Sequence, residues 1–185
     1  MVKLDEPDEE AHPSSRYARP VPLKHVDPAS TPGLARRGYV AFLRTRLGRW
    51  TGINIAARVD PWLLPRTNGR LGLGLMLPNA LLEATGAKSG VTRACPVLYF
   101  HDGSDVILVA SSFGREKDPA WSHNLMAHPQ CRLGGEPFTA EVIEDTEARD
   151  RAWALADRVY PGYADYRVRA GRVGRTIPLF RLTPA

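Results

Sequence analysis

Residues suited to binding an anion gather at a turn that two glycines enclose. Lys88 and Ser89 lie on the turn, and Arg93 follows it. Gly86 and Gly90 would let backbone amides point outward as an anion-binding nest, which two cations would complete for a phosphodiester. An ordinary hairpin with solvated basic side chains fits the same residues. The turn alone leaves both interpretations open.

A run of small residues forms a second candidate site. Ser111, Ser112, Phe113 and Gly114 follow an apolar stretch that is typical of a strand. Small residues at the end of a strand permit close approach of a flat ligand to the backbone, and the alternative is an ordinary exit into a loop. Trp121, further along, would cover an aromatic ring or pack in the core, because tryptophan serves both purposes.

Three tyrosines at a spacing of three residues form a third candidate site: Tyr160, Tyr163 and Tyr166. Buried hydroxyls need partners, so we expect that the three cannot all be core residues. They would line a pocket for a planar, partly polar substrate. The alternative is the end of a helix and a loop packed on the rest of the fold.

Short strands joined by hairpins must position these candidates. Asp102-Gly103 is a strong hairpin signal, and Gly134-Gly135 indicates another. Helices are predicted from Asp118-Pro119 to Pro129 and from Asp145 or Thr146 to about Tyr160. The predicted strands are 81–85, 92–100, 105–111, 130–133, 139–143 and 177–182. Such short antiparallel strands favour a small barrel.

The first third of the chain differs from the rest. Residues 1–32 hold six prolines and no sustained apolar period, so they predict a flexible tail before a single domain of 33–185. N-terminal helices are expected within 33–64, one at 34–50 and a shorter one at 53–64. The first has an apolar stripe of Tyr39, Leu43, Leu47 and Trp50 among arginines. This stripe would pack on the barrel or lie on an anionic membrane surface.

Composition narrows the class of protein. The chain has 185 residues and a formal net charge of +5, which favours an anionic partner such as a nucleic acid, a membrane surface or a phosphorylated coenzyme. No motif for binding nucleic acid supports the first of these. Cys95 and Cys131 form no CxxC pair, so we expect no zinc ribbon and no metal site. The acidic start lacks a signal peptide, so a cytoplasmic protein is expected.

Several of these pieces occur together, in order, in one known family. The run of residues 60–184 resembles the deazaflavin-dependent nitroreductases, which share a TGRKSG-type turn, a P-L-Y strand, a DG hairpin and a helix of the P-x-W type. The matching segments here are TGAKSG, PVLYF, VASSFG, PAWSHNLMAHP, YPGYADY and RTIP. The chain departs from the pattern at Ala87, where a second basic residue is usual, and at Ser112-Phe113, where lysine or glycine is common.

The resemblance implies a mainly β fold with helices (α+β), a split β-barrel of the flavin-reductase and FMN-binding type. It implies an oxidoreductase that uses reduced 8-hydroxy-5-deazaflavin, coenzyme F420, to pass a hydride to a quinone, a nitro compound or an activated alkene. FMN on the same fold, or a protein that only carries the coenzyme, remain alternatives. The resemblance predicts no oligomeric state.

The resemblance also implies a role for each candidate. Lys88, Ser89 and Arg93 fall on the phosphate-binding turn of the family. The segment that contacts the ring system corresponds to Ser111, Ser112, Phe113 and Gly114, with Trp121 on the following helix. Tyr160, Tyr163 and Tyr166 fall on the substrate side, and together with Ser111 they are the predicted catalytic residues. A small-molecule electron acceptor is the expected partner, with peripheral contact at the inner face of the cell membrane as a further expectation.

Overall fold

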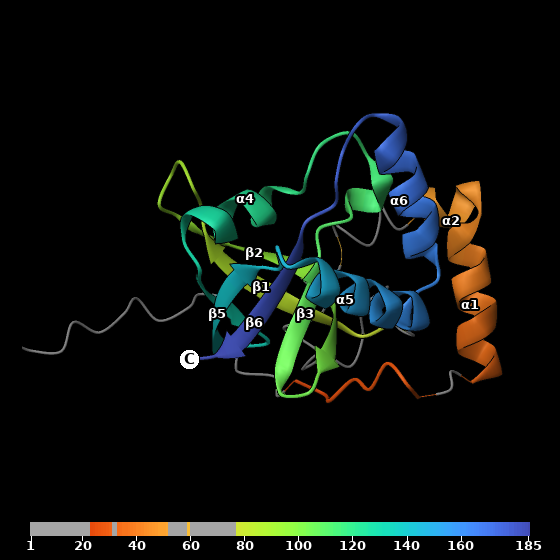
Figure 1. Cartoon of the computed structure of the whole chain (residues 1–185), viewed down its shortest axis with the longest axis horizontal. Helices are drawn as coiled ribbons and strands as arrows, with labels where there is room; N and C mark the ends of the chain where they lie inside the picture. Colours follow the sequence, from red (N-terminus) through yellow and green to blue (C-terminus); the bar gives the residue numbers. More distant parts are fainter. Residues whose placement is uncertain (1–22, 31–32, 52–58, 60–76) are drawn as a thin grey trace, which may run out of the picture.

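The strands of this chain are rich in apolar side chains and close into a barrel. The computed structural model describes residues 23–30, 33–51, 59 and 77–185 (Figure 1). Its strands are β1 (Asn79–Thr85), β2 (Thr92–Asp102), β3 (Asp105–Val109), β4 (Gln130–Leu133), β5 (Glu136–Val142) and β6 (Leu179–Pro184). They pair in the order β1-β2-β3-β6-β5-β4, all antiparallel, and β4 pairs back with β1. The predicted barrel is confirmed.

Both faces of the barrel wall are buried where helices cover it. Along β3, Val106 and Leu108 belong to the cluster that fills the barrel, whereas Ile107 and Val109 belong to a second cluster outside it. Successive side chains of a strand point to opposite faces, so a continuous apolar strand requires cover on both sides. The second cluster therefore anchors the helices to the barrel.

Two helices provide most of that cover. The predicted helix α5 (Thr146–Val159) begins where the Asp145 carboxylate accepts a hydrogen bond from the Ala148 amide, at 2.8 Å. Ala152, Ala156 and Val159 of α5 are buried in the second cluster. After it comes α6 (Gly162–Arg172), a helix where the sequence indicated a loop. Both helices lie on one side of the barrel in Figure 1.

The predicted helix at 34–50 is two helices, α1 (Leu34–Arg44) and α2 (Arg46–Thr51). Thr45 separates them because its hydroxyl donates to the Phe42 carbonyl oxygen and accepts from the Gly48 amide, at 2.7 and 3.0 Å. This local capping competes with a continuous helix. The helix expected at 53–64 lies outside the described residues, apart from residue 59. No helix within the described ranges is long and apolar enough to cross a bilayer.

Part of the expected N-terminal tail is attached to the barrel. Residues 23–30, here called the strap, are held through Val26, whose amide donates to His101 Nδ1 at 3.1 Å and whose carbonyl accepts from the His101 amide at 3.0 Å. Leu23 and Val26 also pack on the core, and this apolar burial explains the attachment. Residues 1–22 and 31–32 of the expected tail are not among those described.

The remaining elements are α4 (Ala120–Ala127) and the short 3-10 turn η2 (Ser112–Gly114). The sequence predicts that Asp118 caps this helix, with Pro119 in its first turn, but Asp118 does not cap α4. Pro119 takes the capping position, and its carbonyl oxygen accepts from both the amide and the hydroxyl of Ser122. Asp118 is instead bound to Arg175, an interaction that belongs to the candidate site below.

Candidate functional site

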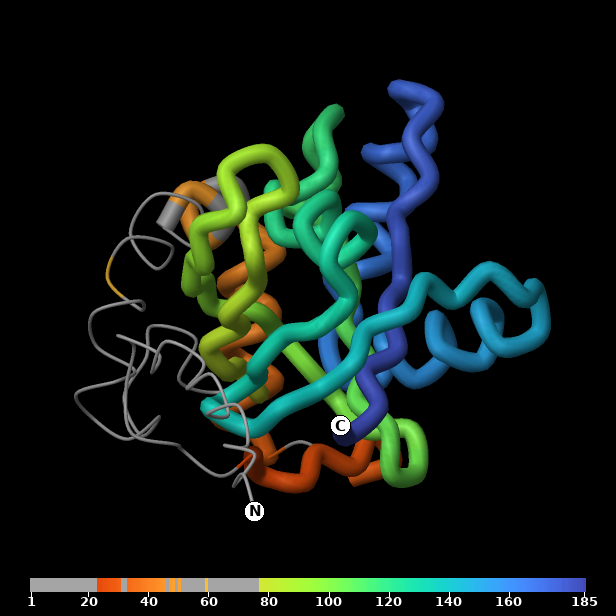
Figure 2. Tube along the Cα trace, turned by 90° about the vertical axis from the view of Figure 1, so that its left-hand side faces the viewer, coloured from red at the N-terminus to blue at the C-terminus, as the bar shows by residue number. Residues whose placement is uncertain are grey.

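The three candidate segments lie at the same end of the barrel. Figures 1 and 2 both show the β1–β2 turn, the segment that carries η2 and helix α6 at the end away from residue 185. The barrel topology explains this, because β1 and β3 both run toward that end and the connections that follow them emerge there. Residues far apart in sequence thus surround one rim.

The β1–β2 turn presents its cations to solvent. Lys88, Ser89 and Arg93 are exposed, and neither cation has an ion pair within the described part of the chain. The expected nest of outward amides is not formed by the two glycines. The Gly86 amide donates to the Val91 carbonyl at 3.0 Å, and the Gly90 amide donates to the Gly86 carbonyl at 2.9 Å. Their hydrogen bonds close the hairpin, so an anion at this turn would depend mainly on side chains.

The turn is fastened to α4 by a residue that sequence reasoning missed. The Asn124 side-chain oxygen accepts from the Ala87 amide at 3.0 Å. This contact joins positions 37 residues apart, and no local signal in the sequence indicates it. It fixes the hairpin tip relative to the helix that carries Trp121.

The segment at η2 has an unusual backbone. Ser112 and Phe113 have φ values of 47° and 58°, in the left-handed region that non-glycine residues seldom adopt. Such conformations cluster at functional sites, where the surrounding structure enforces them. Gly114, with φ of 72°, lies so close to α6 that an added Cβ would be 2.9 Å from the Tyr166 carbonyl oxygen. Only glycine fits there, so the η2 segment and α6 form one packed unit.

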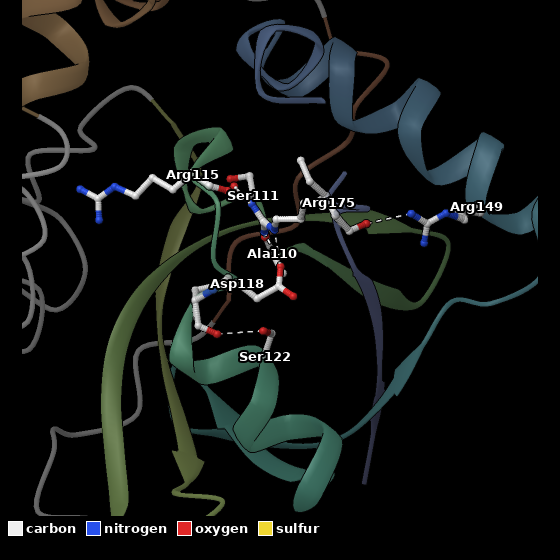
Figure 3. A network of polar contacts seen from close by, with 9 residues as sticks. Ala110, Ser111, Arg115, Asp118, Ser122, Arg149 and Arg175 are labelled. Carbon is white, nitrogen blue, oxygen red and sulfur yellow. Dashed lines mark hydrogen bonds and ion pairs between the residues drawn. The ribbon is translucent and has the colours of Figure 1, made fainter. Parts of the chain in front are cut away.

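Arg175 holds the η2 segment in place (Figure 3). Its guanidinium donates to the carbonyl oxygens of Ser111 and Arg115, at 3.0 and 2.7 Å, and to that of Ala110. It also pairs with the Asp118 carboxylate, with Nε 2.6 Å from Oδ1. The Arg175 side chain is only 7% exposed. A guanidinium suits this position because it is planar and has several donors in fixed directions. It can therefore bind several backbone carbonyls that have no partner in a helix or strand.

The three tyrosines form a buried aromatic cluster beside η2. Tyr160, Tyr163 and Tyr166 are 2%, 2% and 5% exposed. The expectation that they cannot all be core residues is therefore wrong. The hydroxyls of Tyr160 and Tyr166 are 3.0 Å apart and satisfy each other, which reduces the cost of burying them. Phe113 packs edge-on against Tyr166, with ring centroids 5.9 Å apart, so the second and third candidate segments touch.

Burial keeps these phenols protonated. It raises the pKa of Tyr163 and of Tyr166 far above the usual value of 10, and it raises the pKa of Tyr160 as well. The charged form of a phenol is disfavoured in an apolar environment. All three groups are thus neutral hydroxyls near neutral pH, able to donate a hydrogen bond.

Arg169 on α6 is a further residue at this place, and sequence reasoning missed it. Its guanidinium carbon lies 5.0 Å from the centroid of the Tyr166 ring. Its Nε and Nη2 atoms are buried and have no hydrogen-bond partner among the described residues. Its position one helical turn after Tyr166 was the available signal, since residues three apart on a helix share a face.

Trp121 packs on the cluster that fills the barrel, whereas the three tyrosines belong to the second cluster. It packs against Phe180 of the barrel interior, with ring centroids 5.5 Å apart, and is partly buried. In the structure Trp121 therefore has a packing role in the first turn of α4. Its predicted contact with the coenzyme stays a prediction.

Known proteins are similar to this chain in sequence. Residues 56–184 match the family model described as F420H(2)-dependent quinone reductase. The F420H(2)-dependent quinone reductase Rv1261c of Mycobacterium tuberculosis is 30% identical over 145 residues, which are 74% of this chain and 95% of that protein. Rv3178 of the same organism is 35% identical over 121 residues, covering 62% of this chain and 98% of the relative.

Two solved structures are also similar to this chain. One described as a domain-swapped dimer is 30% identical and covers 74% of this chain and 98% of its own, with a TM-score of 0.52. The F420-H2 dependent reductase FDR-A is 34% identical over 57% of this chain and 93% of its own, with a TM-score of 0.48. The family match extends over the whole barrel, the η2 segment and α6. The chain belongs to the F420H(2)-dependent quinone reductase family.

Proposed function

We propose that this protein is an oxidoreductase that transfers a hydride from the reduced deazaflavin coenzyme F420 to a quinone. Family membership supports the reaction class. The observation that carries the proposal is the contact between the left-handed η2 segment and the tyrosine cluster on α6. The segment proposed for the coenzyme ring and the residues proposed for the acceptor are adjacent, as a hydride donor and acceptor must be.

The residues present fit a planar coenzyme with an anionic tail. Lys88 and Arg93 offer two exposed cations at the barrel rim, which suits a phosphodiester. Gly114 brings the backbone of the η2 segment close to α6. Lys88, Ser89 and Arg93 would hold the phosphate, whereas Ser111, Ser112, Phe113 and Gly114 would lie along the ring, with Trp121 on the adjoining helix.

The coenzyme, when bound, supplies the hydride, and the protein supplies position and electrostatics. The network around Arg175 would hold Ser111 in a fixed place for the ring. The paired phenols of Tyr160 and Tyr166 would donate a hydrogen bond to the acceptor, with Tyr163 behind them. Packing of the cluster would keep water from the transferred hydride.

The first experiment tests cofactor choice and activity together. Purified protein is titrated with F420 and with FMN by fluorescence, and oxidation of the reduced deazaflavin by menadione is then followed. We expect tighter binding of F420 and turnover with menadione. Tight binding of FMN without binding of F420 would support the FMN alternative, and binding of F420 without turnover would support a carrier.

We also propose that the protein is cytoplasmic and that α1 and α2 contact the inner face of the cell membrane. Leu34, Phe42, Leu47 and Trp50 are between 41% and 82% exposed on these helices. Apolar side chains on a basic helix suit the boundary of an anionic bilayer, where quinones also dissolve. Tyr39 and Leu43 instead pack on the second core cluster, so the helices would dock on the barrel and on lipid at once.

Liposome cosedimentation tests the membrane contact. The full chain is expected to sediment with anionic vesicles at low salt and to be released at high salt, because salt screens exposed charges. A variant with Phe42, Leu47 and Trp50 replaced by serine should stay in the supernatant while it still binds F420. If the full chain never sediments, α1 and α2 serve only to cover the barrel.

A further inference from the structure

Arg169 carries a buried charge that this fold leaves partly unsatisfied. Both Nε and Nη2 are shielded from solvent, yet they donate no hydrogen bond to any described residue. A buried donor without an acceptor is costly, and in native proteins it requires an explanation such as a bound group. The residue as a whole is only partly exposed, so Arg169 lies at the edge of the core and not deep within it.

Other charged residues of α6 have ion-pair partners, unlike Arg169. Arg44 pairs with Asp165, and Arg167 pairs with Asp157, at 2.9 and 2.6 Å. Arg169 lies on the same helix as Asp165 and Arg167 and has no carboxylate partner among the described residues. Asp157 and Asp165 are thus matched to other arginines, and no described carboxylate of either helix forms an ion pair with Arg169.

The surroundings of Arg169 indicate where that partner would lie. Its guanidinium stacks over the Tyr166 ring, and its Cβ lies 3.1 Å from the position of a Cβ on Gly114. It therefore stands at the junction of the η2 segment and the Tyr160–Tyr166 hydroxyl pair. Other arginines here are not available: Arg175 is committed to carbonyls and Asp118, and Figure 3 shows Arg115 extended away from that network.

We propose that Arg169 is a catalytic residue that binds the acceptor oxygen on which negative charge develops. The inference rests on the proposed function. In that reaction a C–H bond of the donor breaks, and the hydrogen moves with its electron pair to the quinone. One quinone oxygen then bears the negative charge until a proton from solvent completes the hydroquinone. A guanidinium aimed at that oxygen stabilises the charged state more than the neutral quinone.

The test uses a ligand that already carries this charge. The anion of 2-hydroxy-1,4-naphthoquinone, which forms at neutral pH, is compared with uncharged menadione by calorimetric titration of the full chain without coenzyme. Wild type should prefer the anion, and Arg169→Met should bind it about tenfold more weakly, the effect of one charge-assisted hydrogen bond. Arg169→Lys should retain part of the preference. Arg172→Met, which removes an exposed charge from the same helix, is the matched control and should bind as wild type does.

Thermal unfolding separates this role from a structural one. Arg169→Met should unfold at the wild-type temperature or above it, because an unsatisfied buried charge is removed, while menadione turnover falls and F420 affinity is kept. A lower unfolding temperature, an unchanged affinity for the anion, or a loss confined to F420 affinity would each overturn the proposal. If wild type binds the anion through Arg169 but does not oxidise reduced F420, the proposed function fails and the anion site stands.

Discussion

At the scale of residues, exposed and buried cations at the barrel rim have different tasks. Lys88 and Arg93 extend into solvent from the turn, whereas Arg175 is enclosed by the carbonyls that it binds. Solvated cations can serve a mobile anionic ligand, and enclosed ones fix the backbone. The predictions for the two kinds of residue differ accordingly.

Replacement of Arg93 by alanine should weaken coenzyme binding. Loss of one contact to a charged group corresponds to about a tenfold rise in the dissociation constant of F420. Turnover at saturating coenzyme should change little, because the turn is proposed to hold the phosphodiester and not the reacting ring. Fluorescence titration measures the constant, and Arg158→Ala on α5 controls for the loss of net charge. An unchanged constant in folded Arg93→Ala would move the phosphate site elsewhere.

Removal of the Tyr166 hydroxyl should depress turnover and spare coenzyme affinity. Tyr166→Phe keeps the ring that packs on Phe113 but loses the hydroxyl that meets Tyr160. We expect kcat with menadione to fall about tenfold or more, the scale of a lost hydrogen bond in the transition state. Tyr163→Phe provides a comparison in the same cluster. Weak F420 binding with normal turnover at saturation would place the tyrosines on the coenzyme side.

Arg175 should control the stability of the fold around the η2 segment. Arg175→Met leaves the Asp118 carboxylate and several carbonyls without their donor, and loss of one partner of a buried pair costs about 3–5 kcal/mol. The free energy of unfolding, measured with urea, should fall by about that much. Asp118→Asn keeps an acceptor for Arg175 and should lose much less. Wild-type stability in Arg175→Met would mean that the η2 segment holds its conformation unaided.

At the scale of elements, the strap of residues 23–30 depends on one histidine. The Val26 amide donates to His101 Nδ1, and this requires the neutral imidazole. Burial, and then the nearby His25, lower the pKa of His101 from its ordinary value of 6.5. The Tyr99 hydroxyl, which donates to the Lys24 carbonyl, and the Glu136 carboxylate, which accepts from the Leu23 amide, also hold the strap. The charge of Glu136 acts in the opposite direction and raises the pKa of His101, but it is the smallest of the three causes.

Acid should therefore loosen the strap. A base with a lowered pKa in the folded state binds fewer protons there than in the unfolded chain, so its contribution is present above pH 6.5 and is lost as the pH falls through the folded-state pKa. The unfolding temperature of wild type should fall on acidification by more than that of His101→Asn, which keeps an acceptor near Nδ1 but does not titrate. Equal pH dependence of the two proteins would contradict this.

Elements with local signals were predictable, and those fixed by distant contacts were not. The hairpins at Asp102-Gly103 and Gly134-Gly135 follow from turn chemistry within a few residues, and the structure confirms both. Helix α6 begins at Gly162, directly after Pro161, and contains Tyr163 and Tyr166, so its local sequence resembles a loop. The packing of Tyr160 and Gly114 against it is what favours the helix. The Arg175–Asp118 pair spans 57 residues and leaves no local pattern.

At the scale of the whole molecule, the closed barrel protects both cysteines. Cys95 and Cys131 are free thiols, and burial raises the pKa of each to about 12 from 9. The thiolate is the reactive form, so this shift lowers the reactivity of both thiols. A thiol reagent should leave both residues unmodified in the native protein at neutral pH and modify both in denaturant. Rapid reaction of Cys95 alone, the less buried of the two, would show that its partial exposure is enough for attack by the reagent.

The strand order also bears on how the chain is made. β6 lies between β3 and β5, so the wall between those strands is missing until residues 179–184 have been synthesised. A nascent chain that ends earlier presents two unpaired strand edges, which are the surfaces that start aggregation. Arg175 is translated just before this strand, and it cannot bind the carbonyls of the η2 segment until β6 pairs with β3. Synthesis of β6, rather than hairpin formation, thus sets the earliest moment at which the rim can be assembled.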